Sequence, residues 1–251
     1  MLKKQVPNII TLLNLLSGCV GVIMAMQNNL VAAAIFVGLG IFFDFFDGLA
    51  ARSLKVQSEL GLQLDSLADM VTSGLVPGIA MFQLLKRSIS YETSIPKDWN
   101  SPGVFDINFP VFALIGLLIT LGSAYRLAKF NIDDRQTSSF IGLPTPANAI
   151  FILSLPLILI FQPEAWIVEI ILNKWFLVVI TILSCFMLNA EIPLFALKFK
   201  NFNLKENWFR FFFLFFALVM IIFLQFIALP IIIISYVLLS LILNSTLKKE
   251  E

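Results

Sequence analysis

The sequence of 251 residues contains no histidine, only two cysteines and few charged residues. Charged residues make up 13% of the chain, whereas an ordinary soluble domain has about a quarter. Because histidine is absent and Cys19 and Cys185 lie in separate apolar stretches, we expect neither a zinc site nor a structural disulfide. A net charge of +1 leads us to expect no nucleic acid partner. Any metal would be held by oxygen atoms, which favours Mg²⁺ or Mn²⁺.

Apolar residues are abundant, at 59% of the chain, and the mean hydropathy is +0.93. They form blocks of about twenty residues, the length that crosses a bilayer core as a helix. The sequence therefore predicts an all-α, polytopic membrane protein with a single transmembrane domain over 1–251, comprising a core of about 1–190 and a C-terminal helical hairpin of about 208–246. We expect about eight spans, near residues 7–27, 30–52, 58–85, 109–130, 145–162, 174–190, 208–227 and 230–246.

The distribution of basic residues predicts the orientation of these spans. If the N-terminus is cytoplasmic, only four of the seventeen lysines and arginines fall on the outer side: Lys86, Arg87, Lys97 and Lys174. This bias predicts an even number of spans with both termini in the cytoplasm. Lys3 and Lys4 precede an apolar stretch, as in a signal peptide, but polar residues and Pro7 interrupt that stretch, so we expect a retained first helix.

Two pairs of aspartates interrupt the second and third predicted spans. Asp44 and Asp47 are three residues apart, and Asp65 and Asp69 are four apart, so each pair lies on one face of its helix. A short turn joins the two spans, which makes them antiparallel neighbours and brings the four carboxylates to one level near the cytoplasmic surface. A carboxylate facing hydrocarbon costs about 3 kcal/mol or more, so intramembrane acids normally face a protein interior and act there.

Four neighbouring carboxylates repel one another unless cations lie between them. Two divalent ions bridged by carboxylates also suit phosphoryl chemistry, because they neutralise a diphosphate and polarise the bond that breaks. Gly48 and Gly61 leave room for a ligand or a facing helix, and Arg52 can hold a phosphate. Each residue alone has a structural alternative: helix packing for Gly48, an interfacial position for Arg52 and an interhelical polar contact for a single aspartate.

The spacing of these residues resembles the signature of the CDP-alcohol phosphotransferases. That signature reads Asp-x-x-Asp-Gly-x-x-Ala-Arg, eight residues, then Gly-x-x-x-Asp-x-x-x-Asp. The chain has every fixed position of it: Asp44, Asp47, Gly48, Ala51, Arg52, Gly61, Asp65 and Asp69. The resemblance implies a core of six transmembrane helices, a homodimer and a site that faces the cytoplasm.

The resemblance also implies roles for these residues. Asp44, Asp47 and Asp65 would hold divalent metal, two ions of Mg²⁺ or Mn²⁺, with Asp69 as the general base and a further metal contact. The CDP part of the donor would contact Gly48, Ala51, Arg52 and Gly61. Asn8 and Thr11 in the first span are further candidates for the nucleotide site, although both residues could instead cap the first helix.

Three further stretches, at residues 7–18, 126–131 and 140–147, resemble the phosphatidylserine synthase branch of this family. In the second of them, Arg126 and Lys129 are candidates for binding the acceptor, although basic residues at a cytoplasmic helix end also follow the positive-inside rule. Lys129 stands where the branch more often has arginine, and lysine lacks the bidentate geometry of a guanidinium.

The branch resemblance implies transfer of a phosphatidyl group from CDP-diacylglycerol to the hydroxyl of L-serine, giving phosphatidylserine and CMP. The protein would then lie among membrane lipids, and we expect the bacterial inner membrane, with the active site on the cytoplasmic side. Two alternatives stay open: the same chemistry with glycerol 3-phosphate or an inositol phosphate as acceptor, and a cation-coupled transporter, which would also use intramembrane carboxylates.

Overall fold

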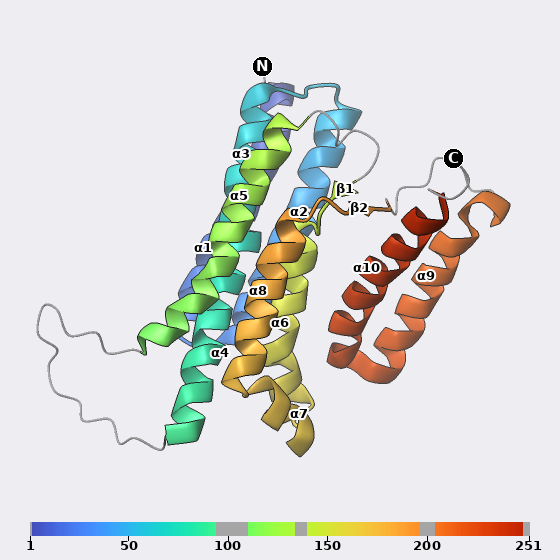
Figure 1. Ribbon diagram of the computed structural model, residues 1–251. Coiled ribbons are helices and arrows are strands. Elements are labelled where there is room, and N and C mark those ends of the chain that lie inside the picture. Colours follow the sequence, from blue (N-terminus) through green and yellow to red (C-terminus); the bar gives the residue numbers. More distant parts are fainter. Residues whose placement is uncertain (1, 94–109, 134–139, 196–203, 248–251) are drawn as a thin grey trace, which may run out of the picture.

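The computed structural model describes residues 2–93, 110–133, 140–195 and 204–247 (Figure 1). Helices make up nearly all of it, and a short antiparallel pair joins β1 (Phe140–Ile141) to β2 (Pro193–Leu194). The prediction of an all-α polytopic membrane protein is confirmed. Six of the basic residues used to predict the orientation lie outside the described residues: Lys97, Arg135, Lys198, Lys200, Lys248 and Lys249.

The first part of the chain folds into three long helical segments. The elements are α1 (Leu2–Met26), α2 (Leu30–Ser53), α3 (Glu59–Asp69), the π-helical turn η1 (Met70–Leu75) and α4 (Val76–Thr93). Asn29 caps α2 by accepting a hydrogen bond from the Ala32 N–H, and Ser58 caps α3 by accepting one from the Gly61 N–H. Because these turns are only a few residues long, α1, α2 and α3 run antiparallel to their neighbours in sequence.

The remaining described residues add six helices and two short 3₁₀ segments. They are η2 (Val111–Leu117), α5 (Leu118–Ile132), α6 (Thr145–Phe161), α7 (Ala165–Ile171), α8 (Lys174–Asn189), α9 (Leu204–Leu224), η4 (Gln225–Ile227) and α10 (Ala228–Leu247). The sequence did not predict α7 or the β1–β2 pair. Two-residue strands and a helix of seven residues are too short to leave a periodic pattern.

Five helical stretches among the described residues are long and apolar enough to cross a membrane, and a sixth is added when α7 and α8 are counted as one bent span. The predicted number of about eight is higher. α6 has only 17 residues, and α9 and α10 fall within one apolar stretch, 207–243. Figure 1 shows α9 and α10 side by side as a hairpin. At 21 and 20 residues, each is about 30 Å long, enough to cross separately.

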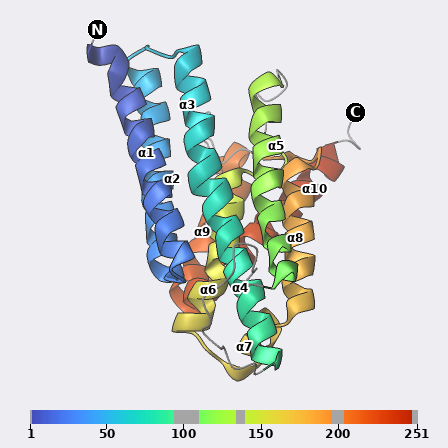
Figure 2. The same ribbon diagram turned by 90° about the vertical axis from the view of Figure 1, so that its left-hand side faces the viewer.

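Small residues bring the first helices into close contact. A Cβ added to Gly40 of α2 would lie 2.4 Å from Thr72 Cγ2 and 2.8 Å from Asn14 Oδ1, and one added to Gly18 of α1 would lie 2.3 Å from Thr72 Oγ1. Such close approach is the usual way in which helices pack inside a membrane, where burial of apolar surface gives no advantage over contact with lipid. Figure 2 shows α1 and α2 packed beside α3.

The α9–α10 hairpin lies beside α6 and holds the segment that follows α8. Tyr236 Oη donates a hydrogen bond of 2.8 Å to the carbonyl of Phe195, whose ring also packs against Phe209 and Phe213. The predicted spans 208–227 and 230–246 placed the turn of this hairpin between residues 227 and 230. The chain instead reverses at η4, and Pro230 lies in the first turn of α10, where its missing N–H costs nothing.

Candidate active site

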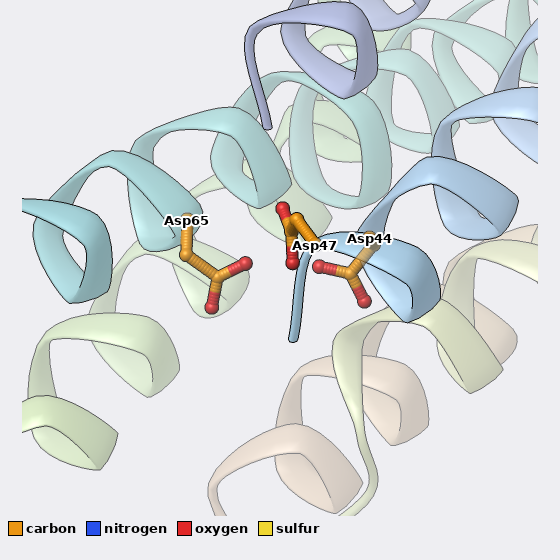
Figure 3. A group of neighbouring side chains, drawn as sticks. All are labelled: Asp44, Asp47 and Asp65. Carbon is orange, nitrogen blue, oxygen red and sulfur yellow. The ribbon is translucent and has the colours of Figure 1, made fainter. Parts of the chain in front are cut away.

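Three aspartates from two neighbouring helices converge at one point (Figure 3). Asp44 and Asp47 come from α2 and Asp65 from α3, and one carboxylate oxygen from each lies within 4.8 Å of the others. Asp47 is buried, while Asp44 and Asp65 are half-buried. The spacing of three residues within α2 and the short α2–α3 turn produce this convergence. The sequence predicted that four carboxylates meet at one level; Asp69 lies outside this group of three but lines a pocket together with all of them.

Helix α1 supplies hydrogen-bond donors behind these carboxylates. Thr11 Oγ1 donates to Asp47 Oδ2 at 2.6 Å, and Asn14 Nδ2 donates to Asp69 Oδ1 at 3.3 Å. Both donors are buried. A carboxylate oxygen held in this way is fixed in direction. Neither Asn8 nor Thr11 caps the first helix, because α1 begins at Leu2.

Asp69 is the last residue of α3, and the π-helical turn η1 begins immediately after it. Single π-helical turns inside helices frequently occur at functional sites. Here the turn places Thr72 against α1, where its Oγ1 donates to the Asn14 carbonyl at 3.1 Å. This hydrogen bond fixes the position of Asn14, whose side chain holds Asp69.

Two pockets flank the aspartates. The first, which we call the α1-side pocket, has a volume of about 460 Å³ and lies between α1, α2, the α2–α3 turn and α3. The second, the α5-side pocket, has a volume of about 480 Å³ and lies between α2, α3, α5 and the start of α6. Asp47, Gly48 and Asp65 line both pockets, so the two spaces meet at the carboxylates.

The structure divides the predicted site residues between these pockets. The α1-side pocket is lined by the candidates for the nucleotide, which are Asn8, Thr11, Gly48, Ala51 and Gly61. Gly61 lies so close to α1 that an added Cβ would be 3.4 Å from Asn8 Oδ1. The α5-side pocket contains Asp44, Asp69, Arg52 and Arg126. Arg52 was expected with the nucleotide residues, but its side chain lines the opposite pocket beside the carboxylates.

Lys129 differs from Arg126 in its position. Arg126 is buried and lines the α5-side pocket, whereas Lys129 lines neither of the two pockets. Lys129 Nζ forms an ion pair of 3.1 Å with Glu191 Oε1 beyond the end of α8. Lys129 lies three residues after Arg126, slightly less than one helical turn, so its side chain leaves the helix in a similar direction. The charged end of Lys129 lies nearer the surface. The structure therefore brings only one of the two predicted acceptor residues to the site.

Several site residues were not among the sequence predictions. Asn14 is the clearest, and its signal was present, since Asn8, Thr11 and Asn14 follow one another at intervals of three along an apolar helix. Ser66 and Thr145 also line the α5-side pocket. Single hydroxyl residues in apolar helices carry no comparable pattern, so only the packing of α3 against α5 and α6 reveals them.

The donor set fits a divalent cation. Asp44, Asp47 and Asp65 offer carboxylate oxygens from two helices, and Asp69 lines the same α5-side pocket as Asp44 and Asp65. Hard oxygen ligands of this kind suit Mg²⁺ or Mn²⁺. The coarse prediction of an oxygen-ligated divalent metal therefore agrees with the geometry.

Comparison with known proteins agrees with the site. The family model for CDP-alcohol phosphatidyltransferase matches residues 4–186. The chain belongs to this family. The match covers α1 to α8 almost completely and includes all four aspartates, so the predictions of the family and of a transferase are confirmed.

Among curated relatives, the CDP-diacylglycerol–serine O-phosphatidyltransferase of Bacillus subtilis is 30% identical over 143 residues, or 57% of this chain and 70% of the relative. The enzyme of the same name from Mycobacterium bovis is 27% identical over 68% of this chain and 54% of the relative. The archaetidylserine synthase of Methanothermobacter thermautotrophicus is 28% identical over 59% of this chain and 56% of the relative. The chain thus spans a little over half the length of the relatives from Mycobacterium bovis and Methanothermobacter thermautotrophicus.

Proposed function

We propose that this protein transfers the phosphatidyl group of CDP-diacylglycerol to the hydroxyl of L-serine, releasing CMP. The observation that carries the proposal is the meeting of two pockets at one group of carboxylates. A reaction that exchanges one alcohol for another on phosphorus needs a space for the leaving nucleotide and a second space for the acceptor, with the phosphorus between them. The names of the three relatives, each of which contains serine or a serine lipid, support serine as acceptor.

In this proposal the CMP part of the donor occupies the α1-side pocket, among Asn8, Thr11, Ala51 and Gly61. The diphosphate lies at the border formed by Asp47, Gly48 and Asp65, where the absence of a side chain at Gly48 lets phosphate oxygens approach the α2 backbone. Asp44, Asp47, Asp65 and Asp69 would hold one or two divalent ions. When bound, such ions neutralise the diphosphate and polarise the bond that breaks.

The acceptor enters the α5-side pocket, where its carboxylate pairs with the Arg126 guanidinium. Asp69, held by Asn14, accepts the proton of the serine hydroxyl. The serine oxygen bonds to the phosphatidyl phosphorus while the bond from that phosphorus to the CMP oxygen breaks. A polar acceptor can reach this pocket from the aqueous side, while the acyl chains of the donor stay in the membrane.

The residues that line the α5-side pocket also bear on the alternative functions. Acceptors with a phosphate, such as glycerol 3-phosphate or an inositol phosphate, favour a denser basic pocket, yet the basic side chains that line the α5-side pocket are Arg52 and Arg126. Serine requires one cation for its carboxylate and acidic or hydroxyl groups for its ammonium. Membership of a transferase family argues against a cation-coupled transporter.

The test is CMP release by the purified protein in detergent, with CDP-diacylglycerol, Mn²⁺ or Mg²⁺, and serine, glycerol 3-phosphate or inositol 1-phosphate. We expect release that requires both serine and metal and that stops on addition of EDTA. CMP release with a phosphorylated alcohol in place of serine would show that serine is not the acceptor, while the proposed phosphatidyl transfer would stand. No release with any acceptor, from folded protein, would overturn the proposed function.

A further inference from the structure

Arg126 carries a buried N–H that lacks a partner. Only 7% of the residue is exposed. Its Nη2 donates to the Gly142 carbonyl at 3.4 Å, while its Nε has no hydrogen-bond partner among the described residues. Buried polar groups are nearly always paired, with protein or with ordered water, because an unpaired charged donor is costly. An acceptor for this N–H is therefore expected nearby.

Asn189, the last residue of α8, carries the complementary unpaired atom. Its Nδ2 donates to the carbonyls of Gly122 at 3.1 Å and Cys185 at 3.0 Å. Because both of these partners are acceptors, the NH₂ end of the amide must face them, and Oδ1 points the other way. Oδ1 is buried and has no hydrogen-bond partner in the part of the chain that the structure describes.

Arg126 and Asn189 line the same small cavity. Its volume is about 10 Å³, and the other lining residues are Lys129, Ile141, Leu188 and Ala190. A cavity of about this size holds one water molecule if polar partners surround it. A water there can accept from Arg126 Nε–H and donate to Asn189 Oδ1, which pairs both atoms at once.

We propose that Asn189 is a positioning residue for Arg126, acting through one bridging water. This inference rests on the proposed function, in which Arg126 binds the acceptor carboxylate. A guanidinium is planar, so fixing its Nε–H and one Nη fixes the plane in which its remaining N–H groups meet a carboxylate. Asn189 thereby sets the geometry of acceptor binding without touching the acceptor.

The surroundings of Asn189 support this role. The end of α8 and the residues after it are hydrogen-bonded to the loop that precedes α6: Gly142 N–H donates to the Ile192 carbonyl at 2.9 Å, and Leu143 N–H to the Met187 carbonyl at 2.8 Å. Gly142, which holds Arg126 Nη2, has a φ of +75° and packs against the carbonyls of Leu188 and Ala190. The Gly142 carbonyl that accepts from Arg126 and the Asn189 side chain thus belong to one joined wall, beside the β1–β2 pair in Figure 1.

Asn189 lies at the end of α8, outside the part of the chain that the family model matches. The match to the family model ends at residue 186, three residues before Asn189. The four aspartates and Arg126 lie inside the match, whereas the residues that complete the wall behind Arg126 lie outside it. Acceptor binding would therefore depend on a segment beyond the matched region.

The experiment compares Asn189→Leu with Asn189→Asp. Both variants lose the hydrogen bonds to Gly122 and Cys185, but only Asp keeps an oxygen toward Arg126. For Asn189→Leu we expect the KM for serine to rise about tenfold, with the KM for CDP-diacylglycerol unchanged, since a hydrogen bond to a charged group contributes about that factor. For Asn189→Asp we expect the serine KM to stay within about twofold of the wild type. Phe186→Leu, on the exposed side of the same turn, is the control.

A double-mutant cycle with Arg126→Lys identifies the residue through which Asn189 acts. In the Arg126→Lys background, Asn189→Leu should add no further change in the serine KM. An unchanged serine KM in Asn189→Leu, or equal changes in both variants and for both substrates, would overturn the proposal. If Asn189→Leu does not fold, the presence or absence of the bridging water in a crystal structure decides the proposal, and a tenfold rise of the serine KM in Asn189→Asp overturns it.

A structural measurement separates this inference from the proposed function. In a high-resolution crystal structure, we expect one ordered water within hydrogen-bond distance of both Arg126 Nε and Asn189 Oδ1. Wild-type protein that releases no CMP with any acceptor would overturn the proposed function whatever this water shows. A cavity filled instead by a direct Arg126–Asn189 contact or by another side chain would overturn the bridging water, even in an active enzyme.

Discussion

Each of the four aspartates has a different set of neighbours, and those neighbours suggest its role. Asp44, Asp47 and Asp65 face one another across α2 and α3. Asp69 lies outside that group of three, and Asn14 holds one of its oxygens. An acid that stands beside the proposed metal ligands, lines the α5-side pocket and has one oxygen held by Asn14 is suited to accept a proton.

We predict that Asp69→Asn lowers kcat by about 10²- to 10⁴-fold, because an amide cannot act as the base. The substitution keeps the size of the side chain, so the melting temperature in detergent should stay close to that of the wild type. CMP release and thermal unfolding are the measurements. Glu169→Gln, an exposed substitution on α7, is the control and should leave both values unchanged. Wild-type turnover in Asp69→Asn would remove Asp69 as the base.

Thr11 acts on the site through Asp47. Its hydroxyl donates a hydrogen bond of 2.6 Å to a carboxylate that would ligate metal, and such second contacts typically change metal affinity by about 10- to 100-fold. We predict that Thr11→Val raises the Mn²⁺ concentration needed for half-maximal activity by about tenfold, while Thr11→Ser, which keeps the hydroxyl, does not. A metal titration of CMP release measures this. Equal behaviour of the two variants would show that the hydroxyl is not needed.

At the scale of the elements, the contact of α1 and α2 with the turn η1 holds the site together. Gly40 of α2 lies close to both Thr72 of η1 and Asn14 of α1. The three segments therefore meet beside Asn14, the residue that holds Asp69. Gly38, two residues earlier in α2, has no atom within 4 Å of an added Cβ. The same helix therefore contains a crowded glycine and an uncrowded one.

We predict that Gly40→Ala destabilises the protein by about 1–3 kcal/mol, because overpacking forces neighbouring backbones apart. Gly38→Ala should be neutral or slightly stabilising, since alanine favours helix by about 1 kcal/mol over glycine. Thermal unfolding of the two variants in the same detergent measures the difference. CMP release should fall in Gly40→Ala alone, as displacement of Asn14 disturbs Asp69. Equal melting temperatures would show that α1, α2 and η1 can separate without cost.

For the whole molecule, the two ends of the helix bundle are chemically distinct. The α2–α3 turn, whose residues help to line the α1-side pocket, lies at one end, and the α6–α7 turn lies at the other end (Figure 1). Large apolar side chains such as Phe42, Phe45 and Phe186 are exposed between these ends, as expected for surfaces that face lipid. Which end faces the cytoplasm is a prediction from the charge distribution.

We predict that a cysteine introduced at Gln57, in the α2–α3 turn, reacts with a membrane-impermeant maleimide in inside-out vesicles and not in intact cells. One introduced at Glu164, between α6 and α7, should show the reverse. Both positions are exposed, and the background would lack Cys19 and Cys185. This pattern would place the α1-side pocket, the proposed site of the nucleotide, on the cytoplasmic side. The opposite pattern would overturn the predicted orientation.

Much of the site could be predicted because it is local in sequence. Asp44, Asp47, Asp65 and Asp69 lie on two consecutive helices, so helical periodicity and a short turn suffice to bring them together. The positions of Arg52 and Lys129 could not be predicted in this way. Periodicity gives the direction in which a side chain leaves its helix, but not whether a long side chain ends in a pocket or at an ion pair such as Lys129–Glu191.

The membrane class, the all-helical architecture and the approach of the aspartates could be predicted from the amino-acid sequence, because these features depend on composition and on contacts between neighbouring segments. The division of the site into two pockets, the support of Asp69 by Asn14 and the small cavity that Arg126 shares with Asn189 depend on the tertiary structure. Those features join residues about sixty positions apart. No local pattern specifies such contacts, since they arise when distant helices pack and their buried polar groups must find partners.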